Sequence, residues 1–269
     1  MNDKRVAAYA VTGFAVRERR FFFMFHDYLK NIDRIEFAVT MACTGRCRHC
    51  SEGDHVNCTG HIDAEVATDA VRKICSHFKI KSLMTFGGEP LLYPEVIYAI
   101  HATAKEMGIP DRQLITNGFF SKSHGKISEV AARLAQCGVN DLLLSVDSFH
   151  QETIPLEPVM FFAECVVKEG IPVELSPAWL VSREDDNPYN MGTRKILDQF
   201  AHLNIIFPEG NALKYLREYF DENVESSSPY EDDPTNVKAV SFSPNGDVDL
   251  MNGNVYETDI IELLKRYRG

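Results

Sequence analysis

The sequence of 269 residues has no apolar stretch long enough to span a bilayer, which argues against a membrane-spanning helix. Its first residues are not followed by the apolar core of a signal peptide, so we expect a cytoplasmic protein. Basic residues are also scarce, since 28 Lys and Arg stand against 39 Asp and Glu, and the net charge is -11. A charge of this sign repels DNA and RNA at long range. Neither a membrane nor a nucleic acid is therefore an expected partner.

Cysteine is scarce as well, with 7 in the chain and none after Cys165. Cys75, Cys137 and Cys165 fall within apolar helical patterns, which predicts that they fill space in the core. Cys58 lies closer in sequence to the remaining three cysteines and is a candidate neighbour of whatever they bind. Unpaired thiols are expected in a reducing compartment, where disulfides are rare.

The other three cysteines, Cys43, Cys47 and Cys50, lie on one short segment with the spacing C-x3-C-x2-C. Three thiolates placed in this way can bind three irons of a four-iron cluster and leave the fourth iron open for chemistry. The spacing is also compatible with a structural zinc ion in a Cys3His site, in which His55 or Cys58 would complete the ligand set. Spacing alone leaves both interpretations open.

Three further motifs follow predicted strands. Together with the cysteine loop, which matches the pattern C-x3-C-x-Φ-C, they resemble the radical S-adenosylmethionine (SAM) enzyme superfamily. The Φ position is usually aromatic and is occupied here by His49, whose ring can still pack against the cluster region. The three motifs are Gly87-Gly88-Glu89-Pro90 after Leu83–Phe86, Thr116-Asn117-Gly118 after Gln113–Ile115, and Ser145-Val146-Asp147 after Leu142–Leu144.

The resemblance implies one 4Fe–4S cluster on Cys43, Cys47 and Cys50, with the amino and carboxylate groups of SAM on the open iron. One electron would cleave SAM to methionine and a 5′-deoxyadenosyl radical, which abstracts hydrogen from a substrate. The implied partners are an electron donor such as flavodoxin or ferredoxin, and a small-molecule or short-peptide substrate that the sequence does not identify. A peptide- or protein-modifying maturase and a zinc-stabilised binding module are the alternatives.

Candidate SAM-binding residues stand at the predicted strand ends. Gly87 and Gly88 would let the backbone approach a ligand closely, and Glu89 is expected to brace their turn. Asp147 and His150 are candidate catalytic residues, although Asp147 is equally suited to capping the following helix. The other candidates for contact with SAM are His49, Asn117, Ser145 and Ser176, with Asn190 and Arg194 as candidates for an adenine or carboxylate pocket.

Strand-like and helix-like segments alternate along most of the chain, which predicts βαβ units and an α/β fold with a parallel sheet. Six such units match the partial parallel (β/α)6 barrel that the resemblance implies. Active sites in parallel barrels lie at the C-terminal ends of the strands, where the motifs are found. The expected strands are residues 35–40, 79–86, 113–116, 141–146, 172–175 and 205–207, and the expected helices are 66–78, 93–107, 126–136, 157–168 and 194–202.

Two flanking segments complete the expected domain organisation around a barrel at residues 33–210. Residues 1–32 form an N-terminal preface whose aromatic run is expected to pack on the core. Residues 211–269 form a C-terminal extension, in which 239–250 predict a hairpin turning at Asn245-Gly246 and 259–267 predict a short helix. This hairpin-helix extension resembles the SPASM/twitch type but lacks its cluster cysteines. We therefore expect it to form a lid or wall of the barrel without a cluster.

Overall fold

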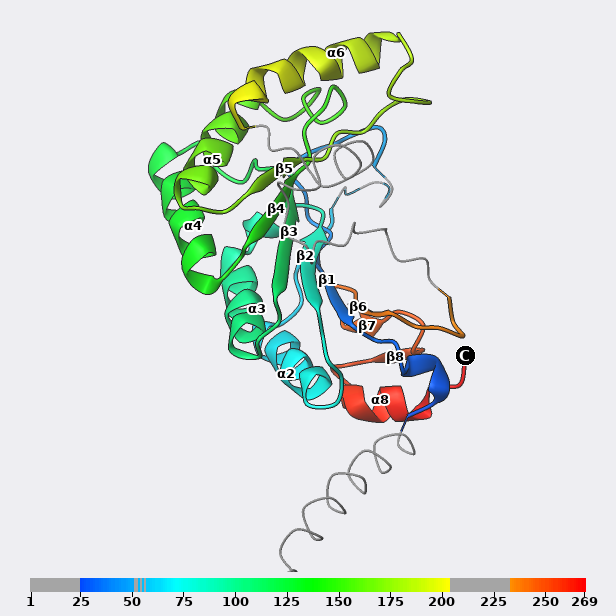
Figure 1. Ribbon diagram of the computed structural model, residues 1–269. Helices are drawn as coiled ribbons and strands as arrows, with labels where there is room; N and C mark the ends of the chain where they lie inside the picture. The colour runs from blue at the N-terminus through cyan, green and yellow to red at the C-terminus, as the bar shows by residue number, and fades with distance from the viewer. Residues whose placement is uncertain (1–24, 51–52, 54, 56, 204–232) are drawn as a thin grey trace, which may run out of the picture.

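A computed structural model describes residues 25–50, 53, 55, 57–203 and 233–269, and within them the chain forms one twisted α/β layer structure (Figure 1). The described strands form an eight-stranded sheet in the order β5-β4-β3-β2-β1-β6-β7-β8. The first five strands run parallel to one another, which confirms the predicted parallel sheet. Their bounds are β1 Arg34–Thr40, β2 Ser82–Gly87, β3 Asp111–Thr116, β4 Asp141–Leu144 and β5 Val173–Leu175.

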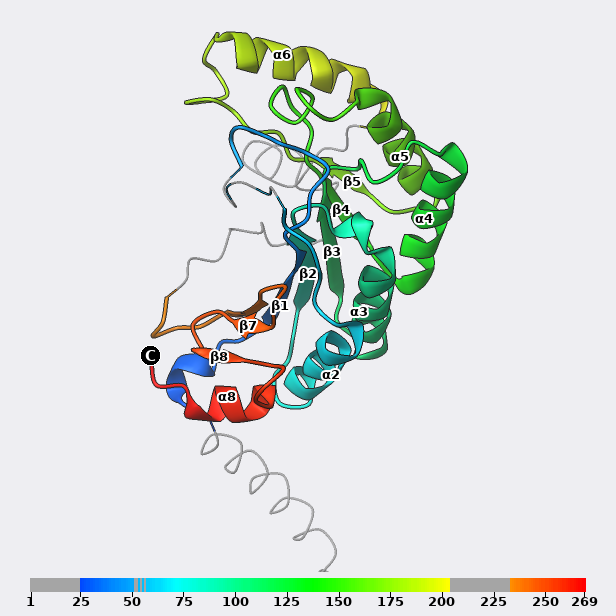
Figure 2. The same ribbon diagram turned by 180° about the vertical axis from the view of Figure 1, so that it is seen from behind.

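Helices α2 to α5 lie along one face of this sheet, and the opposite, concave face is left to line the site (Figure 1, and from behind in Figure 2). The predicted cap at Asp63 is confirmed, because its side chain accepts hydrogen bonds from the backbone N–H groups of Glu65 and Val66. The helices are α2 Ala64–Cys75, α3 Pro94–Glu106, α4 His124–Cys137, α5 Leu156–Lys168 and α6 Pro188–Leu197, with short 3-10 helices η1 Asp27–Leu29, η2 Pro90–Leu92 and η3 Asp198–Leu203.

The predicted start of the helix at residue 194 was wrong by two turns. Helix α6 begins at Pro188, because Asn187 accepts a hydrogen bond from the N–H of Asn190 and Pro188 occupies the first turn, where a missing N–H costs nothing. The sixth barrel strand, expected at 205–207, lies outside the described residues. The sheet formed by the described strands is not closed, in agreement with a partial rather than a complete barrel.

Side chains alternate between the two faces of the central strands, and the pairing fixes which of them share a level. Ile115 pairs with Leu143, and Leu143 with Glu174, all on the concave face. The N–H of Ser145 donates to Thr116 and the N–H of Ser176 donates to Leu144, both at 2.9 Å. Ser145 and Ser176 therefore extend past the strand ends at the same C-terminal edge.

The C-terminal extension adds to the sheet on the other side of β1. Strand β6 (Ala239–Phe242) pairs parallel with residues 34–37, and β7 (Asp247–Val248) returns antiparallel, so the predicted hairpin is confirmed. Strand β8 (Gly253–Asn254) and helix α8 (Ile260–Arg266) follow. Buried Phe37 and Phe242 stack with ring centroids 4.7 Å apart, which joins the extension to the main core.

Within the described residues, none of the helices is long and apolar enough to cross a membrane. The three cysteines predicted to fill the core are only half-buried, although each packs against it from α2, α4 or α5. Most of the aromatic run in the N-terminal preface lies outside the described residues, and Phe25 contacts the rings of His77 and Phe78.

Candidate active site

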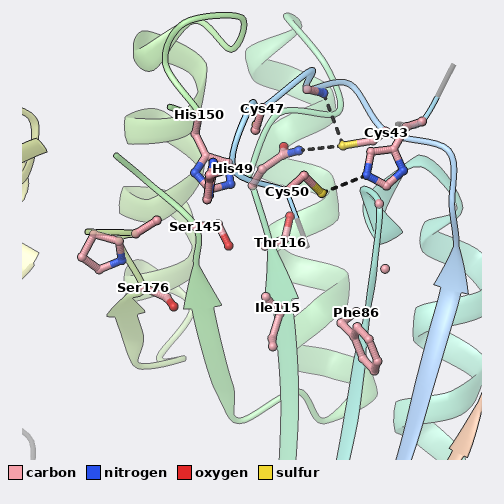
Figure 3. Close-up of a pocket in the computed structure, with 17 residues that line it drawn as sticks. Cys43, Cys47, His49, Cys50, Phe86, Ile115, Thr116, Ser145, His150 and Ser176 are labelled. Carbon is pink, nitrogen blue, oxygen red and sulfur yellow. Dashed lines mark hydrogen bonds between the residues drawn. The ribbon is translucent and has the colours of Figure 1, made fainter. Parts of the chain in front are cut away.

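A pocket of about 450 Å³ lies at the C-terminal edge of the parallel strands, beneath the loop that follows β1 (Figure 3). Its size is that of a site for one small ligand. The side chains come from five successive strand ends, as the barrel architecture predicts. The lining residues are Cys43, Gly45, Cys47, His49, Cys50, His55, Phe86, Gly87, Gly88, Ile115, Thr116, Asn117, Ser145, His150, Ser176, Pro177 and Ala178.

The cysteine loop is anchored at its base by Thr40, the last residue of β1. The buried Thr40 hydroxyl donates to the carbonyl of Gly60 at 2.6 Å and accepts from the N–H of Ala42 at 3.0 Å. One side chain therefore joins the two ends of the loop. This brings Cys43, Cys47 and Cys50 together in the pocket wall.

The sulfur of Cys43 has hydrogen-bond donors that suit a thiolate, and the sulfur of Cys50 lies beside a histidine ring. Cys43 Sγ accepts from the N–H of Gly45 at 3.3 Å and from the side-chain amide of Asn117 at 3.5 Å. Cys50 Sγ lies 3.1 Å from His55 Nε2. His55 is buried, and its Nδ1 donates to the carbonyl of Met41 at 2.8 Å, which fixes the ring. Such contacts around sulfur ligands tune a bound cluster.

Burial favours the protonated thiol at Cys43 and at Cys47. Burial raises the pKa of Cys43, and it raises the pKa of Cys47 to about 12, where the nearby Cys43 and Asp147 add to the effect. Bound iron or another metal cation would supply the missing positive charge and hold both residues as thiolates.

The donor set in the pocket wall consists of the three thiols of Cys43, Cys47 and Cys50. In a four-iron cluster each thiolate binds a different iron, and the fourth iron stays open. A Cys3His zinc site would need a histidine as the fourth ligand, and His55 Nε2 lies 3.1 Å from Cys50 Sγ. The three thiols fit the cluster that the motif predicts.

Gly87 and Gly88 lie where no side chain fits. Gly87 has φ +136°, and a Cβ there would overlap the carbonyl oxygen of Thr40; a Cβ on Gly88 would overlap that of Ala42. The N–H of Gly88 donates to Thr40 at 2.7 Å and the N–H of Glu89 donates to Ala42 at 2.8 Å. These two glycines line the pocket as predicted, and they also seat the cysteine loop.

Glu89 lies beneath the pocket rather than in its lining. Its carboxylate is fully buried and accepts from the N–H of Leu91, the hydroxyl of Thr116 and the N–H of Asn117, at 2.7 to 2.9 Å. The bracing role expected for Glu89 is what its contacts support, and its assignment to cofactor contact is not supported. Burial raises its pKa to about 7 against the opposing effect of these donors.

Asn117, Ser145 and Ser176 all line the pocket at the ends of β3, β4 and β5. Asn117 is also tied to the cysteine loop, because its amide donates to the hydroxyl of Thr44 at 3.3 Å and to Cys43 Sγ. Ser145 and Ser176 point toward the same space in Figure 3. Three short polar side chains thus face the cysteines across the pocket.

Asp147 is fully buried outside the pocket lining, whereas His150 reaches it. One oxygen of Asp147 accepts from the N–H groups of Phe149 and His150, and the other from the N–H of Ala178 and the ring Nδ1 of His150 at 2.8 Å. Burial opposes ionisation of Asp147, but the bonds and charge of His150 and the Ala178 amide hold its pKa below the usual value. Asp147 therefore caps the turn and orients His150.

His49, at the Φ position, is enclosed by rings. Its centroid lies 4.9 Å from that of Phe149 and 4.8 Å from that of His150, and Phe149 stacks on Tyr189 at 4.7 Å. Arg48 reaches across to Glu152 and to the hydroxyl of Tyr189, which ties the cysteine loop to α6. Burial lowers the pKa of His49, so its imidazole is favoured in the neutral form.

Asn190 and Arg194 do not line the pocket, so their suggested place in an adenine or carboxylate pocket is not supported. The buried Asn190 amide donates to the carbonyls of Leu180, Ser182 and Asp185 and thereby shapes the loop before α6. Arg194 pairs with Asp186 at 2.8 Å. Both residues hold this loop in place.

The sequence reasoning missed part of the lining. Phe86 and Ile115 form an apolar floor. Strand alternation could have found them, since each lies two positions before a predicted site residue, Gly88 and Asn117 respectively. His55 was considered only as a zinc ligand. Pro177 and Ala178 follow β5, and nothing in their residue types indicates a site.

Comparison with known proteins gives a match to the model of the radical SAM superfamily over residues 37–169. GTP 3′,8-cyclase of Desulforamulus reducens is 27% identical over 132 residues, 48% of this chain and 39% of that protein. GTP 3′,8-cyclase of Clostridium perfringens is 24% identical over 159 residues, 55% of this chain and 47% of that protein. The chain thus spans less than half the length of these relatives.

Solved structures share the fold. A structure of anSMEcpe with bound AdoMet matches with a TM-score of 0.54 and 14% identity, over 86% of this chain and 80% of that one. A structure of the same protein with AdoMet and the Kp18Cys peptide matches with a TM-score of 0.53.

Proposed function

The chain belongs to the radical SAM superfamily, and on this premise we propose that it is an enzyme with a single 4Fe–4S cluster on Cys43, Cys47 and Cys50. SAM occupies the adjoining pocket. The bound cofactors supply the reductive cleavage of SAM to methionine and a 5′-deoxyadenosyl radical that abstracts hydrogen. The observation that carries the proposal is the set of three thiols in the wall of one pocket at the C-terminal strand edge.

Different pocket residues would bind different groups of SAM. The backbone carbonyls of Gly87 and Gly88, which line the pocket, would accept hydrogen bonds from the SAM ammonium group. Asn117, Ser145 and Ser176 offer an amide and two hydroxyls to the ribose and carboxylate. His49 provides a ring surface, and the apolar floor of Phe86 and Ile115 excludes water from the reacting carbon.

His150 is the titratable group best placed to act on substrate. It reaches the pocket, and its Nδ1 is engaged by Asp147 at 2.8 Å, so Nε2 is the nitrogen available to hold or accept a proton. Asp147 acts through His150 and not on the substrate directly.

The substrate is a small molecule or a short peptide. A pocket of about 450 Å³ is suited to one small ligand, which leaves the substrate to enter from the open side. The relatives named above act on GTP, whereas anSMEcpe was crystallised with a peptide. A peptide-modifying role is the second candidate, and co-purification with a precursor peptide would decide for it.

Delivery of electrons requires an external donor such as flavodoxin or ferredoxin, and a cytoplasmic location would protect the cluster from oxidation. We retain the division into a preface at 1–32, a barrel at 33–210 and an extension at 211–269. Because β6 lies in the same sheet as β1, the extension supports the barrel from its edge. The described residues of the extension, 233–269, are not among those that line the pocket.

The test is anaerobic reconstitution followed by reduction with dithionite in the presence of SAM. We expect about four irons and four sulfides per chain and the release of 5′-deoxyadenosine. Cys43→Ala, Cys47→Ala and Cys50→Ala should each abolish both, whereas Cys165→Ala on α5 should leave both unchanged. One equivalent of zinc without visible charge-transfer absorption would contradict the proposal and favour a zinc-stabilised binding module.

A further inference from the structure

We propose that Cys47, His49 and His150 form a second metal site, which takes a single divalent ion of the zinc or cobalt type when the cluster is absent. Cys47 Sγ and one ring nitrogen of each histidine lie within 4.8 Å of one another. Among the described residues, no other set of three metal-ligating side chains comes so close together. In the view of Figure 3 both imidazoles lie beside Cys47, on the side away from Cys43 and Cys50.

The surroundings of His150 are those of a metal ligand. Histidine ligands usually donate their second ring N–H to a carboxylate or carbonyl, which fixes the ring and its tautomer. His150 Nδ1 lies 2.8 Å from Asp147 Oδ2, so Nε2 is left for the metal. Asp147 is itself held by three backbone N–H groups, from Phe149, His150 and Ala178, at 2.8 to 2.9 Å.

The second indication of a metal site is the environment of His49. Its Nδ1 is buried and has no hydrogen-bond partner among the described residues. Buried nitrogen atoms without partners are rare because their desolvation is not compensated. The ring is held by Phe149 at 4.9 Å between centroids, so it cannot easily turn away to find water. A metal ion between His49, His150 and Cys47 would engage the available nitrogen atoms.

The ligand chemistry selects the ion. Two imidazoles and one thiolate suit zinc and cobalt, and three protein ligands leave a fourth tetrahedral position for water or another small ligand. Cys43 and Cys50 do not belong to this set, since among the described residues only Cys47, His49 and His150 form a group whose ligand atoms all lie within 4.8 Å of one another. Cys47 is the only residue shared with the proposed cluster. If that cluster forms as proposed above, the two metal states exclude each other.

The experiment is a Co²⁺ titration of the full-length, cluster-free protein under anaerobic conditions, followed by absorption spectroscopy. Thiolate-to-cobalt charge transfer together with tetrahedral d–d bands is expected for the unmodified sequence. His49→Ala and His150→Ala should weaken binding by at least about tenfold, and Cys47→Ala should remove the charge-transfer band. Cys43→Ala is the matched control and should bind Co²⁺ with unchanged affinity.

The same variants then undergo cluster reconstitution, which separates this proposal from the enzyme assignment. His49→Ala and His150→Ala should still assemble the cluster, which also shows that they fold, whereas Cys43→Ala should not. Cobalt binding that needs Cys43 or Cys50 and is indifferent to both histidines would overturn the second site. So would the absence of a thiolate band in the unmodified protein.

Discussion

The loops around this pocket are held in place mainly by buried polar side chains. Glu89, Asp147 and Asn190 belong to motifs or helices that suggested ligand contact, yet each is fully buried and forms hydrogen bonds with backbone groups of the neighbouring loops. Their role is to fix the loops that carry the pocket residues. Buried groups of this kind cost free energy whenever one partner is lost, so their effects are measurable as stability.

Asn190→Ala should lower the free energy of unfolding by about 1–3 kcal/mol, because the carbonyls of Leu180, Ser182 and Asp185 would lose a buried donor. Urea denaturation measures the change. Met191→Ala, at the exposed neighbouring position on α6, is the control and should change stability little. Equal effects of the two variants would contradict the loop-holding role.

His101 should make the fold sensitive to acid. It is fully buried on α3, with Nε2 2.9 Å from the hydroxyl of Thr85, and burial lowers its pKa to about 3. The folded-state pKa is thus below the unfolded value of about 6.5, so the stabilisation is complete above pH 6.5 and is lost as the pH falls toward 3. Within that window, protonation of His101 should lower the free energy of unfolding by about 1.4 kcal/mol for each unit by which the pH falls.

Denaturation of His101→Gln between pH 7 and pH 4 checks this. The variant should show a shallower loss of stability than the unmodified protein, while His124→Gln, at an exposed position on α4, should keep the original slope. A slope that His101→Gln leaves unchanged would show that another group carries the acid sensitivity.

At the scale of elements, the C-terminal ends of the strands position the pocket residues. The positions of these strand ends were the part of the fold that the sequence predicted best. Each motif follows an apolar run that forms a strand within one to three residues of the expected bounds, because a buried parallel strand has a distinctive composition. The start of α6 was not predictable from the apolar period. Only Asn187 and Pro188 mark it, and both residue types are common in loops.

Gly88→Ala should disrupt the contact between the loop after β2 and the cysteine loop. Its Cβ would overlap backbone atoms of Met41 and Ala42, which cannot move without breaking the Gly88–Thr40 hydrogen bond. We expect a loss of about 1–3 kcal/mol in thermal or urea denaturation and weaker retention of the cluster.

Gly125→Ala is the matched control for this substitution. Gly125 lies in the first turn of α4, and a Cβ there meets only the Ser123 hydroxyl at 3.9 Å. Alanine should be neutral or stabilising by up to about 1 kcal/mol. If both glycine variants behave alike, the close approach at Gly88 is not what constrains the loop.

For the whole molecule, the position of the extension could not be derived from the sequence. The hairpin was predicted from its turn, but parallel pairing of residues 34–37 with 239–242 joins segments far apart in the chain, and no local pattern specifies such a partner. The extension also contacts α2, since Lys73 pairs with Asp259 at 2.6 Å. It thus completes the edge of the sheet beside the strand that leads to the cysteine loop.

Phe242→Ala should destabilise the whole fold by about 3–5 kcal/mol, because Phe242 is buried and stacks on Phe37 at the junction of β6 and β1. Val167→Ala, at a partly exposed position on α5, should cost much less. A single unfolding transition shifted as a unit is expected in calorimetry. A separate low-temperature transition for the extension would contradict the shared core.

The central claim is that the proposed cluster has one iron open to SAM. Electron paramagnetic resonance of the reduced, reconstituted protein with SAM labelled with ¹⁵N in the amino group and ¹⁷O in the carboxylate tests it most directly. The account predicts hyperfine coupling of both labels to the cluster signal. A cluster whose signal shows no coupling to bound labelled SAM, or a lone tetrahedral zinc ion in its place, would contradict it.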